Sequence, residues 1–154
     1  MNVLIVEDVD TKFTEVRAAV ASVLPADAEY SRASNLNEAE DAVMEGSWDL
    51  VVLDLSMDIA QNGSVDFSAG HASLGGLDVL ERMSLLKIDH PTVLVTGFDS
   101  FQDSDRFDNA IMNLSDIDAL ASDWLGKSYL GCIRYGSEGW STRLSRALKA
   151  WSKK

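Results

Sequence analysis

The chain has 154 residues, of which 46% are hydrophobic, and its formal net charge is −12 at pH 7. This length is typical of one domain that buries its own core, and the apolar content argues against disorder. The acidic charge excludes an ordinary nucleic-acid surface, and no apolar run reaches the roughly 20 residues of a membrane span. Cys132 is the single cysteine, so an internal disulfide is excluded. We therefore expect a cytoplasmic protein with a buried thiol.

Short apolar, β-branched runs alternate along the chain with segments that have apolar residues at helical spacing. Asp10 or Thr11 could cap the first helix, and Asn35 with Glu38 has the spacing of a capping box for the second. The alternation predicts strands over residues 2–6, 28–33, 48–55, 92–97 and 129–135, and helices over about 10–23, 36–45, 76–86, 115–124 and 139–151.

Two segments interrupt this alternation. Residues 58–75 are rich in Gly, Ser and Asn, and residues 98–114 contain four aspartates, so both predict long loops. Long loops inside a compact domain are usually functional or mobile. Ser115 is the predicted N-cap of the helix that follows, with Asp118 at its third position.

Strands that are apolar throughout, each followed by a helix, predict a parallel sheet covered on both faces. With right-handed crossovers, the obvious arrangement for five strands is the flavodoxin-like order 2-1-3-4-5, a three-layer α/β sandwich. We expect residues 1–154 to form this single domain, with the two long loops at its rim.

Polar side chains follow the predicted strands at their carboxyl ends. Glu7 and Asp8 end the first strand, Asp54 the third, Thr96 the fourth, and Arg134 lies near the end of the fifth. In the predicted order these strand ends lie at one edge, where open sheets of this kind bind ligands. Three neighbouring carboxylates repel one another unless a cation joins them, and their oxygens suit Mg²⁺. A divalent ion there could also bind a phosphoryl oxygen, with hydroxyl and guanidinium groups holding the others.

The segments VLIVED, WDLVVLDLSM, GGLDVLERM and VLVTG resemble the receiver domain of two-component response regulators. The likeness covers nearly the whole chain in element order and is strongest up to Gly97. It implies that Asp54 is the phosphoacceptor and that Glu7 and Asp8 bind Mg²⁺. It also implies that the backbone carbonyl of Ser56 is a further metal ligand.

The same resemblance assigns Thr96 as the switch hydroxyl and Gly97 as the small residue that leaves room for the phosphate. Some positions depart from the family pattern. Arg134 stands where a lysine followed by a proline is usual, with Lys127 as the alternative, and Gly131 stands where an aromatic is usual. These departures weaken the prediction of ordinary output switching more than the prediction of phosphorylation.

The leading hypothesis is a phosphorylation-controlled switch, which is a regulator and not a classical enzyme. A histidine kinase or phosphotransfer protein would supply the phosphoryl group, and the output would pass to a protein target, with no nucleic acid and no membrane involved. We expect no output domain after the fifth unit, and whether the chain forms a homodimer stays open. One alternative is an interaction module that does not depend on phosphorylation. The other is a haloacid-dehalogenase-type phosphatase with Asp8 as nucleophile.

Overall fold

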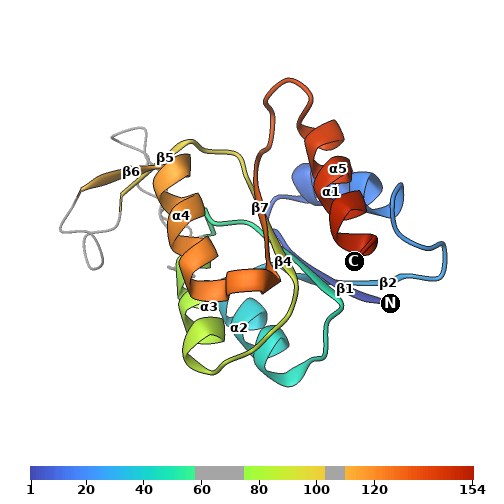
Figure 1. Ribbon diagram of the computed structural model, residues 1–154, viewed down its shortest axis with the longest axis horizontal. Helices are drawn as coiled ribbons and strands as arrows, with labels where there is room; N and C mark the ends of the chain where they lie inside the picture. Colours follow the sequence, from blue (N-terminus) through green and yellow to red (C-terminus); the bar gives the residue numbers. More distant parts are fainter. Residues whose placement is uncertain (58–74, 103–109) are drawn as a thin grey trace.

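The computed structural model describes residues 1–57, 75–102 and 110–154 (Figure 1). A five-stranded sheet forms the centre, and all its neighbouring strands are parallel. Its order is β2-β1-β3-β4-β7, which confirms the predicted flavodoxin-like arrangement. The strands are β1 (Asn2–Val6), β2 (Glu29–Ala33), β3 (Leu50–Leu53), β4 (Thr92–Thr96) and β7 (Tyr129–Arg134).

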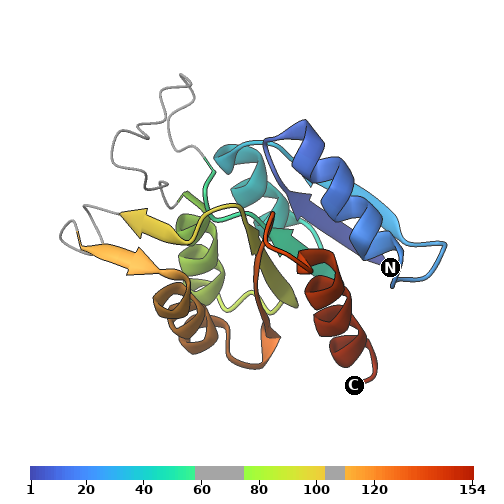
Figure 2. The ribbon, with the colours of Figure 1, turned by 90° about the horizontal axis from the view of Figure 1, so that it is seen from above.

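Helices cover both faces of the sheet, as Figure 2 shows. On one face lie α1 (Asp10–Ala21) and α5 (Trp140–Ser152), and on the other lie α2 (Leu36–Glu45), α3 (Gly75–Leu85) and α4 (Leu114–Leu125). A short 3₁₀ helix, η1 (Gly126–Ser128), connects α4 to β7. None of the helices in the described ranges is long and apolar enough to cross a membrane.

The apolar runs of the strands supply two separate cores because successive side chains point to opposite faces. In β1, Val3 and Ile5 pack in the core under α1 and α5, whereas Leu4 and Val6 pack in the core under α2, α3 and α4. This two-sided burial explains why β1, β3 and β4 are buried almost throughout and show no alternating pattern.

The prediction that residues 98–114 form one long loop is wrong. The segment contains β5 (Ser100–Gln102) and β6 (Ile111–Asn113), which pair antiparallel next to α4 and apart from the main sheet (Figure 1). Phe101 anchors the pair because its side chain is fully buried. Strands of three residues are too short to show alternation, and aspartates in the segment favoured the interpretation as a loop. Residues 58–74 and 103–109, where the other loop predictions fall, lie outside the described residues.

Two predicted helix caps are also wrong. The N-cap of α4 is Asn113, not Ser115, and it forms a capping box with Asp116 in place of Asp118. Neither Asp10 nor Thr11 caps α1, because Val9 occupies that position without a side-chain bond, and the Asp10 carboxylate instead pairs with Arg32.

At α2 the predicted cap is confirmed, since the side chain of Asn35 accepts a hydrogen bond from the backbone of Glu38. The capping box is not completed, however, because the carboxylate of Glu38 accepts hydrogen bonds from Ser34 and not from the backbone of Asn35.

Cys132 is only partly buried, in contrast to the prediction, because β7 is an edge strand of the sheet. Its side chain packs against the core under α4, and burial still raises the pKa of the thiol to about 12.

Candidate functional site

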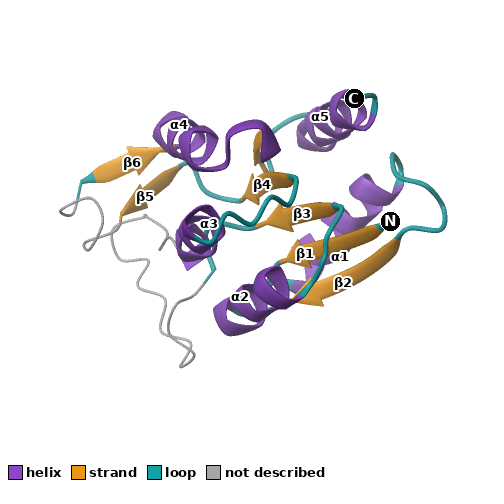
Figure 3. Cartoon of the chain, turned by 60° about the horizontal axis from the view of Figure 1, so that its bottom comes forward, coloured by secondary structure: helices purple, strands orange, loops and turns teal. Residues whose placement is uncertain are grey.

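The carboxyl ends of β1 and β3 bring two carboxylates together. Val6 lies opposite Leu53 in the parallel pair, so Glu7 and Asp54 leave the sheet side by side, and Figure 3 shows β1, β3 and β4 pointing the same way. One carboxylate oxygen from each of Glu7, Asp8 and Asp54 lies within 4.8 Å of the others. All three residues line a hollow of about 490 Å³ at this edge.

The three carboxylates differ in their surroundings. Glu7 and Asp54 are buried, whereas Asp8 is exposed. Oδ1 of Asp54 accepts hydrogen bonds from the backbone nitrogen of Ser56 at 3.1 Å and from its hydroxyl at 2.9 Å. Oε1 of Glu7 accepts from the backbone nitrogen of Val9 at 3.1 Å. The buried acids are therefore held in fixed positions, and Asp8 supplies the side of the cluster that faces water.

Lys12 of α1 completes this site, and sequence reasoning missed it. Its Nζ lies 2.7 Å from Oε2 of Glu7 and 3.2 Å from Oδ1 of Asp54, and it donates to the carbonyl of Val95 at 2.9 Å. The side chain is almost fully buried and passes 5.5 Å from the ring centre of Tyr135. A signal was present in the sequence, because residues 12, 16 and 20 form the buried stripe of α1 at i, i+4 spacing.

The electrostatics of the cluster favour a bound cation. Burial raises the pKa of Glu7 to about 7, and the charge of Asp54 adds to this rise, while Lys12 opposes it. Ionising Glu7 therefore costs free energy, and additional positive charge nearby would offset this cost. Three convergent carboxylate oxygens are the hard ligands that Mg²⁺ prefers, so the residues present fit a divalent metal.

The next strand ends bring Thr96 and Arg134 to the same edge, where they lie opposite each other in the register of β4 and β7. Thr96 is fully buried, and its hydroxyl accepts from the backbone nitrogen of Phe98 at 3.4 Å. It is not among the residues that line the hollow, whereas Gly97, Phe98 and Arg134 are.

Arg134 lines the same hollow as the acidic cluster, and one of its donors has no partner among the described residues. Its Nη1 donates to the carbonyl of Tyr135 at 2.7 Å. Its Nε is buried and has no hydrogen-bond partner in the described part of the chain. Lys127, the alternative cation, is exposed in η1 and precedes the start of β7, so it lies at the opposite end of that strand from Arg134.

Gly76 at the start of α3 packs directly behind the Asp54 segment. Its backbone nitrogen donates to the carbonyl of Leu55 at 3.0 Å. A Cβ at this position would lie 2.5 Å from the carbonyl oxygen of Asp54 and 2.6 Å from the Cα of Leu55. Only glycine lets the helix approach so closely, and this contact fixes the backbone on which Asp54 is carried.

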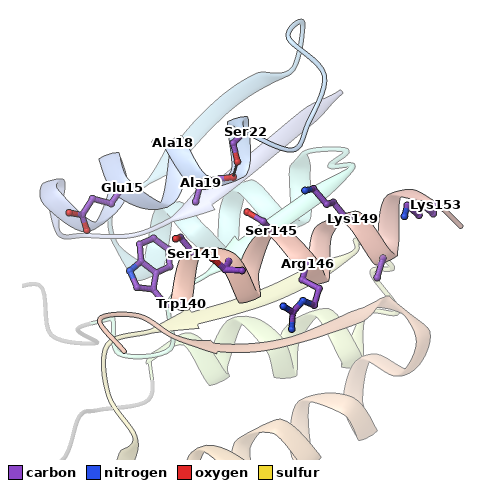
Figure 4. A pocket seen from close by; sticks show the side chains of 12 residues that line it. Glu15, Ala18, Ala19, Ser22, Trp140, Ser141, Ser145, Arg146, Lys149 and Lys153 are labelled. Carbon is purple, nitrogen blue, oxygen red and sulfur yellow. Dashed lines mark hydrogen bonds between the residues drawn. The ribbon is translucent and has the colours of Figure 1, made fainter. Parts of the chain in front are cut away.

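A second hollow, of about 840 Å³, lies between α1 and α5 (Figure 4). Small residues line much of it, and Arg146, Lys149 and Lys153 of the α5 side contribute cations, with Glu15 as the one carboxylate. None of the predicted site residues contributes to it, so the candidate chemistry belongs to the smaller hollow at the strand ends.

No family model matches the chain, and no curated protein matches it. Solved structures do match. A receiver domain from Methanospirillum hungatei JF-1 has 14% identity and a TM-score of 0.62, with 99% of this chain and 93% of that chain covered. The receiver domain of a DNA-binding response regulator from Colwellia psychrerythraea 34H has 20% identity and a TM-score of 0.62, with 100% and 99% covered.

A third match is the phosphorylated cyanobacterial phytochrome response regulator RcpA, at 16% identity and a TM-score of 0.58, with 99% of this chain and 91% of that chain covered. These likenesses extend over nearly the whole chain. The chain therefore has the fold of a response regulator receiver domain, as the sequence motifs predicted.

Proposed function

We propose that the chain is a signalling switch in which Asp54 accepts a phosphoryl group from a histidine kinase or phosphotransfer protein, with Mg²⁺ as cofactor. The observation that carries this proposal is the cluster of Glu7, Asp8 and Asp54 in a hollow at the carboxyl edge of a receiver-type sheet. The receiver fold supports a signalling regulator over a classical enzyme. The output is a contact with a protein target.

The metal ligands in this proposal are the carboxylates of Glu7, Asp8 and Asp54 and the backbone carbonyl of Ser56. When bound, Mg²⁺ supplies positive charge that reduces the repulsion between the acceptor carboxylate and the incoming phosphoryl group. The exposure of Asp8 supports this arrangement because it leaves one side of the cluster open to a hydrated ion.

The contacts of Asp54 indicate which of its two carboxylate oxygens accepts the phosphoryl group. Oδ1 receives the donors of Ser56 and Lys12, whereas no described residue donates to Oδ2. Oδ2 therefore forms the new bond to phosphorus, the bond from phosphorus to the donor breaks, and the donor keeps that electron pair. With acetyl phosphate the leaving group is acetate, and with a phosphohistidine it is the imidazole nitrogen.

Thr96 and Arg134 hold the phosphoryl oxygens in this proposal. The buried Nε of Arg134 supports the role, because Arg134 lines the hollow and an anionic oxygen would satisfy a donor that has no partner among the described residues. The open space around Gly97, where a Cβ would meet no atom within 4 Å, leaves room for the group.

The test is intact-protein mass spectrometry after incubation with acetyl phosphate and Mg²⁺. We expect the wild type to gain the mass of one phosphoryl group and Asp54→Asn to gain none. Asp49→Asn is the matched control, because Asp49 precedes β3 at the other end of the strand and its carboxylate binds the backbone of Asn2. A wild type without the mass gain, or an Asp54→Asn variant that still gains it, would contradict the proposal.

One observation favours the phosphorylation-independent module as a second candidate. Lys12 already pairs with Glu7 and Asp54, so these two buried acids have a positive partner within the chain itself. In that case Asp54→Asn would leave the affinity for the protein partner unchanged, whereas the switch predicts a change. The haloacid-dehalogenase-type alternative, with Asp8 as nucleophile, gains no support from the three structures described above, which are response regulators or their receiver domains.

A further inference from the structure

Among the described residues, Lys12 is the cation that contacts Asp54, the proposed phosphoacceptor, and it comes from a helix. Its ammonium group has three N–H donors and three acceptors in reach, namely Oε2 of Glu7, Oδ1 of Asp54 and the carbonyl of Val95. These acceptors come from the ends of β1, β3 and β4. The Nζ of Lys12 therefore lies between the carboxylate of Asp54 and the carbonyl of Val95, the residue before Thr96.

We propose that Lys12 also binds the phosphoryl group on Asp54 and neutralises part of its charge, alongside the contact proposed for Arg134. This inference rests on the proposed function. The resemblance to receivers gave the neutralising charge to the lysine position at the end of the fifth strand, for which Arg134 and Lys127 were the candidates. The geometry assigns it to the third residue of α1.

The chemistry of the acceptor gives the reason. Before phosphorylation, Lys12 binds Oδ1 as part of a carboxylate. Once Oδ2 is bonded to phosphorus, Oδ1 becomes the neutral carbonyl oxygen of an acyl phosphate and loses most of its attraction for the ammonium group. The phosphoryl group brings about two negative charges to the same carboxyl. A lysine has a flexible stem with rotatable donors, so one N–H can transfer from Oδ1 to a phosphoryl oxygen while Glu7 and Val95 still hold the other two.

Arg134 does not replace Lys12 in this role. In the part of the chain that the structure describes, no ion pair joins Arg134 to Asp54 or Glu7, and its Nη1 is engaged by the carbonyl of Tyr135. Lys12, by contrast, is already in contact with the acceptor before any group is transferred. Its almost complete burial strengthens that contact because water screens it little.

The experiment measures the rate constant of phosphorylation by acetyl phosphate with Mg²⁺ in the wild type, Lys12→Gln and Lys12→Arg. Lys127→Gln is the matched control, because it removes the same charge from an exposed residue in η1. We expect Lys12→Gln to lower the rate constant by about tenfold or more, since a hydrogen bond to a charged group contributes on this order. Lys12→Arg should recover part of the loss, and Lys127→Gln should match the wild type.

If Lys12→Gln is phosphorylated as fast as the wild type, the role of Lys12 is refuted and the proposed function stands. If the wild type itself gains no phosphoryl group, the proposed function fails and this inference fails with it. Circular dichroism checks that each variant is folded. Should Lys12→Gln not fold, the lysine ammonium signals of the wild type decide by NMR, with Lys12 assigned from Lys12→Arg. Saturation with beryllofluoride and Mg²⁺ should shift the Lys12 signal, and an unchanged signal would overturn the inference.

Discussion

Gly76→Ala tests whether the close approach of α3 to the acceptor segment stabilises the fold. The added Cβ would lie 2.5 Å from the carbonyl oxygen of Asp54 and 2.6 Å from the Cα of Leu55. Both are backbone atoms, so no side-chain rotation can relieve the overlap. Either α3 or the end of β3 has to move.

The expected magnitude combines two effects of opposite sign. Overpacking of a well-filled core costs about 1–3 kcal/mol, and contacts with backbone place this case near the upper end. Alanine in place of glycine stabilises a helix by up to about 1 kcal/mol. We therefore expect Gly76→Ala to lower the free energy of unfolding by about 1–2 kcal/mol. For a chain of this length that corresponds to a decrease in Tm of roughly 2–8 °C.

The assay is urea unfolding followed by tryptophan fluorescence, with Gly97→Ala as the matched control. A Cβ on Gly97 would meet no atom within 4 Å, so its free energy of unfolding should stay within about 0.5 kcal/mol of the wild type. If Gly76→Ala were as stable as Gly97→Ala, the reasoning from close packing would be refuted. Because the carbonyl of Asp54 is one of the two contacts, we also expect slower phosphorylation of Gly76→Ala by acetyl phosphate.

Three further outcomes follow from the described residues. Asn113→Ala removes the hydrogen bond that the backbone nitrogen of Asp116 donates to Oδ1 of Asn113, and it should cost about 1 kcal/mol in urea unfolding, whereas an unchanged midpoint would contradict the cap. Leu148→Ala truncates a fully buried side chain of α5 and should cost about 2–5 kcal/mol, whereas a loss below 1 kcal/mol would mean that α5 is not packed on the sheet. The raised pKa of Cys132, about 12, keeps the thiol protonated at pH 8. Folded protein should then react with a disulfide reagent far more slowly than unfolded protein, and equal rates would contradict the partial burial of this thiol.

The main sheet could be predicted because its strands are encoded locally. The runs at residues 2–6, 50–53 and 92–96 are apolar on both faces, and this pattern together with the intervening helices leaves few topologies. The meeting of Glu7, Asp8 and Asp54 followed from the same rule, since the ends of neighbouring parallel strands share one edge.

Lys12 and the β5–β6 pair could not be predicted in the same way, because both depend on contacts between distant segments. A lysine in the first turn of a helix is ordinarily solvated, and Lys12 is buried only because β1, β3 and β4 bring it acceptors. Likewise, β5 depends on the buried position of Phe101, which no local sequence pattern predicts. The position of Lys12 on the same stripe as Val16 and Val20 was the one available sign.

The positive charge beside Asp54 is carried by a residue of a helix, so the direction in which the Lys12 side chain points depends on the rotation of α1 about its axis. Each added residue turns an α-helix by about 100°. Inserting one residue between Lys12 and Val16 would keep every ligand of the acidic cluster in the chain, yet it would turn Lys12 by about 100° relative to the buried residues Val16 and Val20. The spacing of Lys12 from Val16 and Val20 therefore constrains this protein together with the identity of residue 12.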